Sequence, residues 1–172
     1  MSVMTHETLA ATEEYTINAF IQDAARDGWL HGRVLDFGCG EQPYRGIIDD
    51  AGCRYEPWDL ARFGGNRSRR DVGDPPSGVY EAIVCTQVLQ YVADPAGTLV
   101  MLRGLLRDGG ALLLTYPTAW PELRDELWRF TRTGAERMVK AAGFSIVDHR
   151  PRFAIDHHGF SLTVGYQMVA CR

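Results

Sequence analysis

Short apolar segments alternate along the chain with longer segments in which apolar residues recur at helical spacing. The apolar segments predict strands at 33–37, 54–58, 80–85, 111–116, 144–148 and 162–171. Helical patterns lie between several of these strands, at 41–51, after Asp94 and at 133–143, and one more precedes the first strand. This alternation is typical of an α/β protein with a mostly parallel sheet and helices on both faces.

Local signals place several helix boundaries. Asp94-Pro95 supplies an N-cap followed by proline at the first helical position. The buried side of that helix is expected to carry Leu99, Val100, Leu102, Leu105 and Leu106. Thr133 and Glu136 have the spacing of a capping box and are expected to open the last helix.

The connection between the last two strands, residues 150–159, has no helical pattern. A crossover between parallel neighbours needs such a pattern, so the last strand is expected to pair antiparallel with the one before it. A short edge strand at 69–72 would bring the sheet to seven strands. The 172 residues fit one domain, 1–172, with a helical cap at 1–30 and the core at 31–172.

Composition narrows the range of partners. The formal net charge is −4, and the main basic cluster is confined to 62–70, so neither a nucleic-acid partner nor a membrane partner is expected. No apolar run approaches the roughly 20 residues needed to cross a bilayer. The N-terminus shows no secretory signal, which makes a cytoplasmic location the expectation. The four cysteines form no Cys-x-x-Cys pair and are expected to be buried thiols, with no metal site.

The first predicted strand runs into a Gly-x-Gly turn at 34–40, Val-Leu-Asp-Phe-Gly-Cys-Gly. Glycines let the backbone approach a ligand closely, although a turn with incidental glycines is the alternative. A dinucleotide-binding turn would have a third glycine where this chain has Pro43, followed by Tyr44. Glu41 would also set a carboxylate beside a pyrophosphate. The turn therefore favours a ligand with a cationic group and no phosphates.

This motif resembles the first motif of class I S-adenosylmethionine-dependent methyltransferases. The resemblance continues through Asp59, Asp71-Val72, residues 84–89 (Val-Cys-Thr-Gln-Val-Leu) and residues 106–110 (Leu-Arg-Asp-Gly-Gly). Residues 128–131, Trp-Arg-Phe-Thr, are similar to a segment of the small-substrate, methyltransferase type 11-like branch. The resemblance implies a Rossmann-like, doubly wound, seven-stranded, mostly parallel sheet with an antiparallel last strand. It also implies S-adenosylmethionine as the cofactor.

The resemblance further implies a role for each matching residue. Asp36 and the backbone of 38–40 would contact the methionine moiety, Asp59 the ribose hydroxyls, and Asp71 with the Val72 amide the adenine edge. Gln87 would lie near the methionine end. The expected cofactor-binding residues are therefore Asp36, Phe37, Gly38, Cys39, Gly40, Asp59, Leu60, Asp71, Val72 and Gln87. Each carboxylate has an alternative role as a helix cap or a solvated loop residue, and Asp74 could replace Asp71.

Methyl transfer from a sulfonium is an in-line displacement that requires alignment and exclusion of water, and an oxygen acceptor also requires a base. Where many relatives read Glu-Val-Leu-Glu-His, residues 87–91 read Gln-Val-Leu-Gln-Tyr, and Tyr91 is expected to be a packed core aromatic. The candidate catalytic bases are His157 and His158. Tyr116 and His149 are further candidates at strand ends.

The expected function is S-adenosylmethionine-dependent methylation of a small molecule. Its pocket would come from the N-terminal helix and residues 116–131 and 150–160. The expected aromatic walls are Trp120, Trp128, Phe130 and Phe153. The alternatives are a non-catalytic domain that binds S-adenosylmethionine or S-adenosylhomocysteine as a sensor or partner subunit, and a nucleotide-dependent oxidoreductase. A shallow pocket would be completed by another chain, which is compatible with a homodimer.

Overall fold

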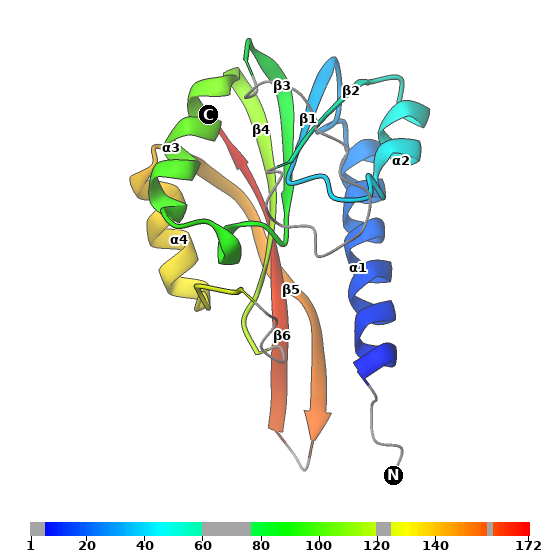
Figure 1. Ribbon diagram of the computed structural model, residues 1–172, viewed down its shortest axis with the longest axis vertical. Helices are drawn as coiled ribbons and strands as arrows, with labels where there is room; N and C mark the ends of the chain where they lie inside the picture. Colours follow the sequence, from blue (N-terminus) through cyan, green and yellow to red (C-terminus); the bar gives the residue numbers. More distant parts are fainter. Residues whose placement is uncertain (1–5, 60–76, 120–124, 158–159) are drawn as a thin grey trace.

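The computed structural model describes residues 6–59, 77–119, 125–157 and 160–172, and its strands form one sheet in the order β2-β1-β3-β4-β6-β5 (Figure 1). The strands are β1 (Arg33–Phe37), β2 (Arg54–Trp58), β3 (Tyr80–Thr86), β4 (Leu106–Pro117), β5 (Ser145–His157) and β6 (Phe160–Cys171). The first four are parallel, whereas β6 pairs antiparallel with both β4 and β5. The α/β class and the antiparallel last strand are thereby confirmed. The described residues contain six strands, and the seventh, expected at 69–72, falls outside them.

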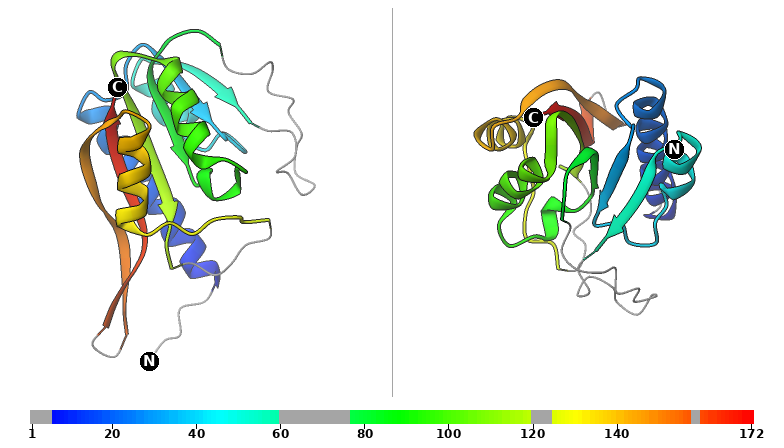
Figure 2. Two further views of the ribbon diagram at one scale, coloured as in Figure 1. Left: turned by 90° about the vertical axis from the view of Figure 1, so that its left-hand side faces the viewer. Right: turned by 90° about the horizontal axis from the view of Figure 1, so that it is seen from above.

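Helices cover both faces of this sheet (Figure 2). α1 (His6–Arg26) and α2 (Arg45–Asp50) lie on one face, and α3 (Pro95–Leu105) and α4 (Arg132–Ala141) lie on the other. Each face has its own apolar core: Ile17, Phe20 and Ile21 of α1 are buried on the first, and Leu99 and Leu102 of α3 on the second. No helix among the described residues is long and apolar enough to cross a membrane.

The glycine turn is longer than its sequence pattern indicates. α2 begins at Arg45, and not at Glu41, because Gln42 has a positive φ of 59° and Tyr44 is the N-cap. The Gln42 N–H donates to the carbonyl oxygen of Cys39 at 2.7 Å, which closes the turn before the helix starts. The backbone after Gly40 is therefore a loop, and Glu41 does not stand at a helix N-terminus.

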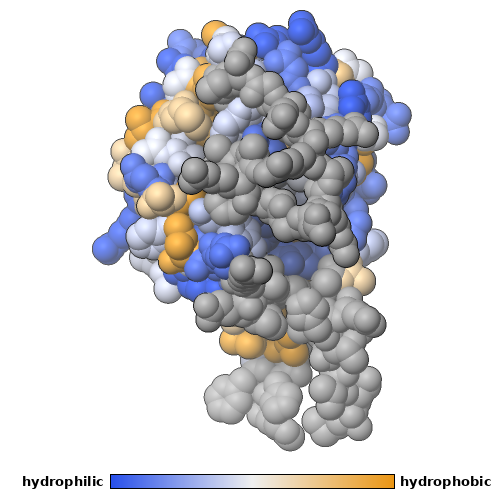
Figure 3. Space-filling model, in the orientation of Figure 1, coloured by the Kyte–Doolittle hydropathy of each residue, from blue (hydrophilic) through white to orange (hydrophobic). Residues whose placement is uncertain are grey.

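α3 begins where the pattern places it but ends earlier. The Asp94 carboxylate accepts a hydrogen bond from the Gly97 N–H at 2.9 Å, as expected of an N-cap. β4 then begins at Leu106, a residue expected in the helix. Val100 was expected on the buried side and is 58% exposed. The hydrophobic residues on the face shown in Figure 3 form small patches between hydrophilic ones, including some at the left edge, where α3 lies.

The cap of α4 also differs from the expectation. Thr131 is the N-cap, and its Oγ1 accepts a hydrogen bond from the Gly134 N–H at 3.1 Å. The capping box predicted from Thr133 is therefore wrong. Glu136 instead contacts Arg132 on its own helix and His149 on β5.

A long hairpin of β5 and β6 replaces the irregular connection expected at 150–159. Its strands pair from Ser145 with Cys171 to His157 with Phe160, whereas β4 pairs with β6 only as far as Gly165. The distal part of the hairpin therefore projects beyond the sheet, beside the N-terminal half of α1 (Figure 1). The pattern missed it because Pro151 and two arginines interrupt the alternation, and the pairing is bulged there.

Candidate functional site

The Gly-x-Gly turn is held against the end of β2 by its own backbone. The Gly38 and Cys39 N–H groups donate to the Trp58 carbonyl oxygen at 2.7 and 3.1 Å. Gly38 has a φ of 78°, and a Cβ added there would lie 2.3 Å from Cγ2 of Val88. Only glycine combines this conformation with such a close approach. The position therefore brings the segment after β3 onto the turn.

Asp59 is joined to the same turn. Its Oδ2 accepts a hydrogen bond from the Gly40 N–H at 3.0 Å. A carboxylate that accepts from a backbone N–H is held more firmly than one that points into solvent. Asp59 and the glycine turn thus form one rigid corner at the carboxyl ends of β1 and β2.

This corner is part of a pocket of about 190 Å³. The lining residues are Phe37, Gly38, Gly40, Trp58, Asp59, Gln87, Val88, Tyr91 and Val92. The Phe37 and Trp58 rings stack with centroids 4.7 Å apart and an interplanar angle of 17°, which makes a flat aromatic wall. A carboxylate, a flat wall and a glycine backbone without side chains can together accommodate a polar molecule that carries a ring.

The structure brings together five of the residues expected at the site, Phe37, Gly38, Gly40, Asp59 and Gln87. Four lining residues were missed. The sequence holds a signal for Trp58, which ends β2 directly before Asp59, but Val88 and Val92 look like ordinary apolar positions. Tyr91 was expected in the core, but it is half-buried and lines the pocket.

Hydrogen bonds of both its backbone and its side chain hold Gln87 in position. Its backbone has a φ of 56°, and its N–H donates to the Thr115 carbonyl oxygen at 3.1 Å. Its Nε2 donates to Oγ1 of Thr115 at 3.2 Å, while its Oε1 accepts from Nε2 of Gln90 at 3.1 Å. The amide is therefore fixed where the end of β3 meets the pocket.

Asp36 and Cys39 lie behind the turn and not on the pocket wall. The Asp36 carboxylate is 1% exposed and accepts a hydrogen bond from the Tyr55 hydroxyl at 2.6 Å. Burial raises the pKa of Asp36 to about 7; the Tyr55 hydrogen bond opposes this shift, and the charge of Asp59 adds to it. Burial likewise raises the pKa of the Cys39 thiol to about 12. A direct contact from either side chain to a ligand stays a prediction.

The remaining expected cofactor-binding residues, Leu60, Asp71 and Val72, lie outside the described residues. His158 and Trp120 lie outside them too, and His157 ends β5, where the backbone alone is described. The roles expected of these residues stay predictions.

Tyr116 and His149, the other candidate bases, are buried together on the α3 and α4 face. Oη of Tyr116 lies 2.7 Å from Nε2 of His149, whose Nδ1 lies 2.8 Å from Oε1 of Glu136. Phe130 packs edge-on against Tyr116, so it belongs to the core and is not a pocket wall. This chain of hydrogen bonds contributes to the packing of α4 on the sheet.

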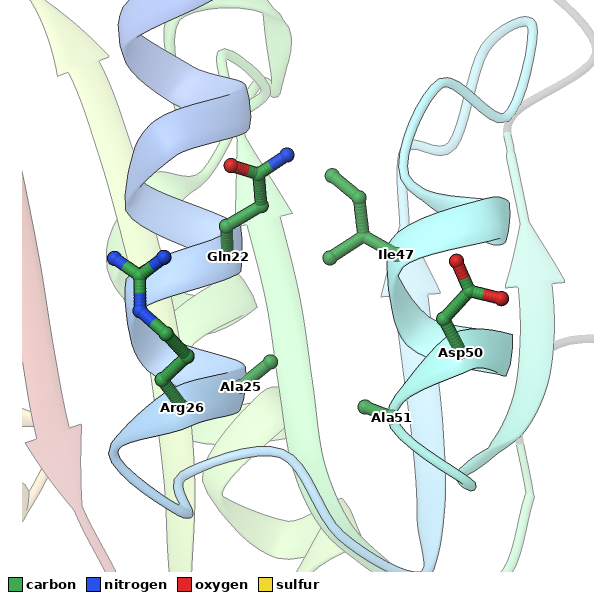
Figure 4. A pocket seen from close by; sticks show the side chains of 6 residues that line it. All are labelled: Gln22, Ala25, Arg26, Ile47, Asp50 and Ala51. Atoms are coloured by element: carbon green, nitrogen blue, oxygen red, sulfur yellow. The ribbon is translucent and has the colours of Figure 1, made fainter.

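A second hollow, of about 410 Å³, lies between α1 and α2 (Figure 4). Its lining residues are Gln22, Ala25, Arg26, Ile47, Asp50 and Ala51. These residues come from the ends of the helices that lead into β1 and β2, so the hollow is at the amino ends of the strands. Ligands of open α/β sheets bind at the carboxyl ends, and the pocket beside the glycine turn is therefore the candidate site.

Comparison with known proteins identifies the family of this chain. Residues 9–149 match a family model described as a methyltransferase domain. The chain belongs to the family of S-adenosylmethionine-dependent methyltransferase domains. The expected cofactor, S-adenosylmethionine, is the methyl donor of that family.

Relatives of this methyltransferase domain are distant. The ubiquinone biosynthesis O-methyltransferase of Aeromonas salmonicida is 24% identical over an alignment covering 73% of this chain and 58% of that protein, so the chain spans little more than half of it. A structure described as a putative S-adenosylmethionine-dependent methyltransferase from Listeria monocytogenes has a TM-score of 0.68 at 13% identity, covering 94% of this chain and 99% of that one. A putative methyltransferase in complex with the Haloferax volcanii Trm112 activator has a TM-score of 0.62 at 14% identity, covering 99% of both chains. These structural likenesses describe the fold.

Proposed function

We propose that this domain transfers a methyl group from S-adenosylmethionine to a small-molecule acceptor by in-line displacement. The observation that carries the proposal is the corner formed by Gly40 and Asp59 beside the aromatic wall of Phe37 and Trp58. It offers a carboxylate for ribose hydroxyls and, beside glycines that carry no side chain, room for an amino acid moiety in one pocket.

The charges around the turn suit a cationic donor. Asp59 lies close enough to Asp36 for its charge to raise the pKa of Asp36, and a sulfonium or ammonium nearby favours an ionised carboxylate. The bound donor supplies an electrophilic methyl group. Gln87 and Tyr91 then line the side of the pocket from which an acceptor approaches. Asp71 with the Val72 amide would read the adenine edge. Leu60 would pack beside it.

Calorimetry with S-adenosylhomocysteine tests the donor site. Asp59→Ala should weaken binding roughly tenfold or more, because it removes a charged hydrogen-bond acceptor. Asp50→Ala, on the exposed end of α2, is the matched control and should leave the affinity unchanged. Wild-type protein that binds NADH but not S-adenosylhomocysteine would contradict the proposal and favour an oxidoreductase.

A non-catalytic role as a sensor or partner subunit is the second candidate. It is supported by Gln87, Gln90 and Tyr91, which stand where many relatives carry two acids and a histidine. A second support is the structural relative that is bound to the activator Trm112. A chain that binds S-adenosylhomocysteine but methylates no acceptor, alone or with such an activator, would fit this role. Light scattering would show whether the chain forms the homodimer that a shallow pocket favours.

The Aeromonas relative is an O-methyltransferase, which makes oxygen the first acceptor atom to test, and methylation of a hydroxyl oxygen requires a base. His157, which ends β5, and the next residue in the sequence, His158, are one proposal for this base. Replacing each with alanine should lower the methylation rate at saturating donor. Unchanged rates in both variants would remove the pair from the mechanism.

A further inference from the structure

One wall of the donor pocket, the pocket beside the glycine turn, is the segment that follows β3. It runs from Gln87 through a short 3₁₀ helix, η1 (Leu89–Tyr91), to Val92. Its polar side chains at the pocket are those of Gln87 and Tyr91. An amide and a phenol form hydrogen bonds, but neither is charged at neutral pH. This wall of the pocket is therefore polar and uncharged.

Gln90 fixes the orientation of the Gln87 amide. Gln90 is 2% exposed, and its Nε2 donates to Oε1 of Gln87 at 3.1 Å. Nε2 of Gln87 then faces Thr115, whose Oγ1 accepts from it at 3.2 Å. An amide nitrogen carries two protons, and among the residues that the structure describes the second proton of Nε2 has no partner. Gln87 can therefore donate this N–H to a molecule in the pocket.

A glutamine at position 90 is not explained by packing. Its Oε1 is buried and has no hydrogen-bond partner in the described part of the chain. A buried acceptor without a partner lowers stability, because it has lost its hydrogen bonds to water. A leucine would avoid this loss, but it could not donate to Gln87. The hydrogen bond to Gln87 therefore gives a reason for Gln90 that the core does not.

The carboxylates whose charges reach this wall are paired with arginines. Burial raises the pKa of Tyr91, and the charges of Glu126 and Glu13 add to the rise. Glu126 forms an ion pair with Arg129, and Glu13 forms one with Arg152 at 2.8 Å. The Tyr91 hydroxyl therefore keeps its proton at neutral pH, and the two acids near it are balanced by two cations.

We propose that Gln87 and Gln90 select an acceptor whose methylated group is a carboxylate. Gln87 donates its remaining N–H to one carboxylate oxygen and leaves the other to react, and Gln90 is the positioning residue that orients this N–H. The inference rests on the function proposed above and names its acceptor class. A carboxylate is ionised at neutral pH, so its oxygen needs no base, whereas the hydroxyl considered above does.

No proton moves in this reaction. A lone pair of the carboxylate oxygen forms a bond to the methyl carbon while the sulfur–carbon bond breaks and leaves its electron pair on sulfur. The products are a methyl ester and S-adenosylhomocysteine. The negative charge of the carboxylate and the positive charge of the sulfonium attract each other before the transfer and disappear together in it. An uncharged wall that donates a hydrogen bond suits such a pair.

Binding of benzoate to the complex of this protein with S-adenosylhomocysteine tests the inference without a known acceptor. Benzamide has nearly the same shape and no charge, and benzyl alcohol carries a hydroxyl instead. Ligand-observed NMR should show saturable binding of benzoate, about fivefold tighter than that of either neutral compound, because hydrogen bonds to charged groups are the stronger ones.

A charge added to the wall should reverse this preference. Gln87→Glu should weaken benzoate binding about tenfold or more, since it replaces the N–H donor by a carboxylate. Gln22→Glu adds the same charge on α1, in the hollow at the amino ends of the strands, and is the matched control. It should leave benzoate binding unchanged.

Gln90→Leu separates positioning from packing. It removes the donor to Gln87 together with the buried oxygen that has no partner in the described part of the chain. The midpoint of urea unfolding should therefore stay or rise, while the affinity for benzoate falls about fivefold. A loss of stability with unchanged benzoate affinity would show that Gln90 has a structural role alone.

The outcomes separate this inference from the donor assignment. If S-adenosylhomocysteine fails to bind, the proposed function fails, and the carboxylate acceptor falls with it. If it binds but benzoate does not, or benzoate and benzamide bind alike, only the inference about the acceptor is overturned. Benzoate binding that survives Gln87→Glu overturns it as well. The comparison with benzamide uses the wild-type protein, so the test stands even if a variant does not fold.

Discussion

The Tyr55 hydroxyl donates a hydrogen bond of 2.6 Å to the carboxylate of Asp36 behind the glycine turn, and both side chains are buried. Burial raises the pKa of Asp36 from 3.8 to about 7, so the folded state holds the proton more tightly than the unfolded chain does. This group therefore contributes stability that is fully present below pH 3.8 and is lost as the pH rises through about 7.

Asp36→Asn should flatten this pH dependence, because an amide can accept from Tyr55 but cannot ionise. Between pH 4.5 and 8, the free energy of unfolding should fall further in the wild type than in the variant, by at most about 4 kcal/mol. Urea unfolding across this range measures the difference. Asp50→Asn on exposed α2 is the control and should follow the wild type; parallel curves for Asp36→Asn would refute the assignment.

Gly38→Ala should disrupt the donor pocket through Val88. The added Cβ would lie 2.3 Å from Cγ2 of Val88, on a residue with a φ of 78°. We expect a loss of about 1–3 kcal/mol of stability and weaker binding of S-adenosylhomocysteine. A second substitution, Val88→Ala, should restore part of both losses.

Gly46→Ala is the control for this pair of variants. A Cβ added at Gly46 in α2 would meet none of the described residues beyond its own helix within 4 Å, and the φ of this glycine is not positive. Alanine there should maintain or raise stability, because it has the higher helix propensity. If Gly38→Ala behaved like Gly46→Ala, Val88 would not pack against the turn as described.

The parts of the site that could be predicted lie close together in sequence or end a strand. Gly38, Gly40 and Asp59 follow this rule, because the carboxyl ends of parallel strands meet at one edge of the sheet. Val92 joins the pocket only through the path of the chain after β3, which no local pattern encodes. The contact between Glu13 and Arg152 joins residues 139 positions apart and depends on a hairpin whose alternation is broken.

The fold was more predictable than the site for a related reason. Alternating strands and helices determine the layers, and the missing helix at 150–159 correctly indicated an antiparallel last strand. The predicted helix boundaries were wrong where tertiary contacts outweigh the local preference of the sequence. Leu106 favours a helix but is the first residue of β4. Thr131, and not Thr133, is the N-cap of α4.

Trp58→Ala should weaken S-adenosylhomocysteine binding about fivefold to tenfold, because the aromatic wall is lost while Asp59 remains. Trp58→Phe keeps a ring against Phe37 and should cost less. Calorimetry gives the affinities, and the loss of a ligand-dependent change in tryptophan fluorescence would place Trp58 at the bound ligand. Trp29→Phe, at a partly buried residue that packs against the core beneath α1, should leave that change intact. Equal affinities for wild type and Trp58→Ala would show that this wall does not contact the ligand.

Tyr116→Phe should lower stability without changing catalysis, because its hydroxyl serves His149 in the core. The Nδ1 proton of His149 is held by Glu136, which leaves Nε2 to accept from Tyr116. Removing that donor should cost about 1–2 kcal/mol of unfolding free energy and leave the affinity for S-adenosylhomocysteine unchanged.

The same chain of hydrogen bonds should make the fold sensitive to acid. Burial lowers the pKa of His149 below its ordinary value, despite the opposing hydrogen bond and charge of Glu136. The folded state therefore binds this proton less tightly than the unfolded chain does. The associated stability is present above the ordinary pKa of about 6.5 and is lost as the pH falls. His149→Gln should remove this dependence in unfolding measured between pH 5 and 7.5, whereas His31→Gln, at an exposed position, should keep it. For the preceding prediction, a Tyr116→Phe protein that kept its stability but lost methyl transfer would instead show that the hydrogen bonds of Tyr116, His149 and Glu136 take part in the reaction.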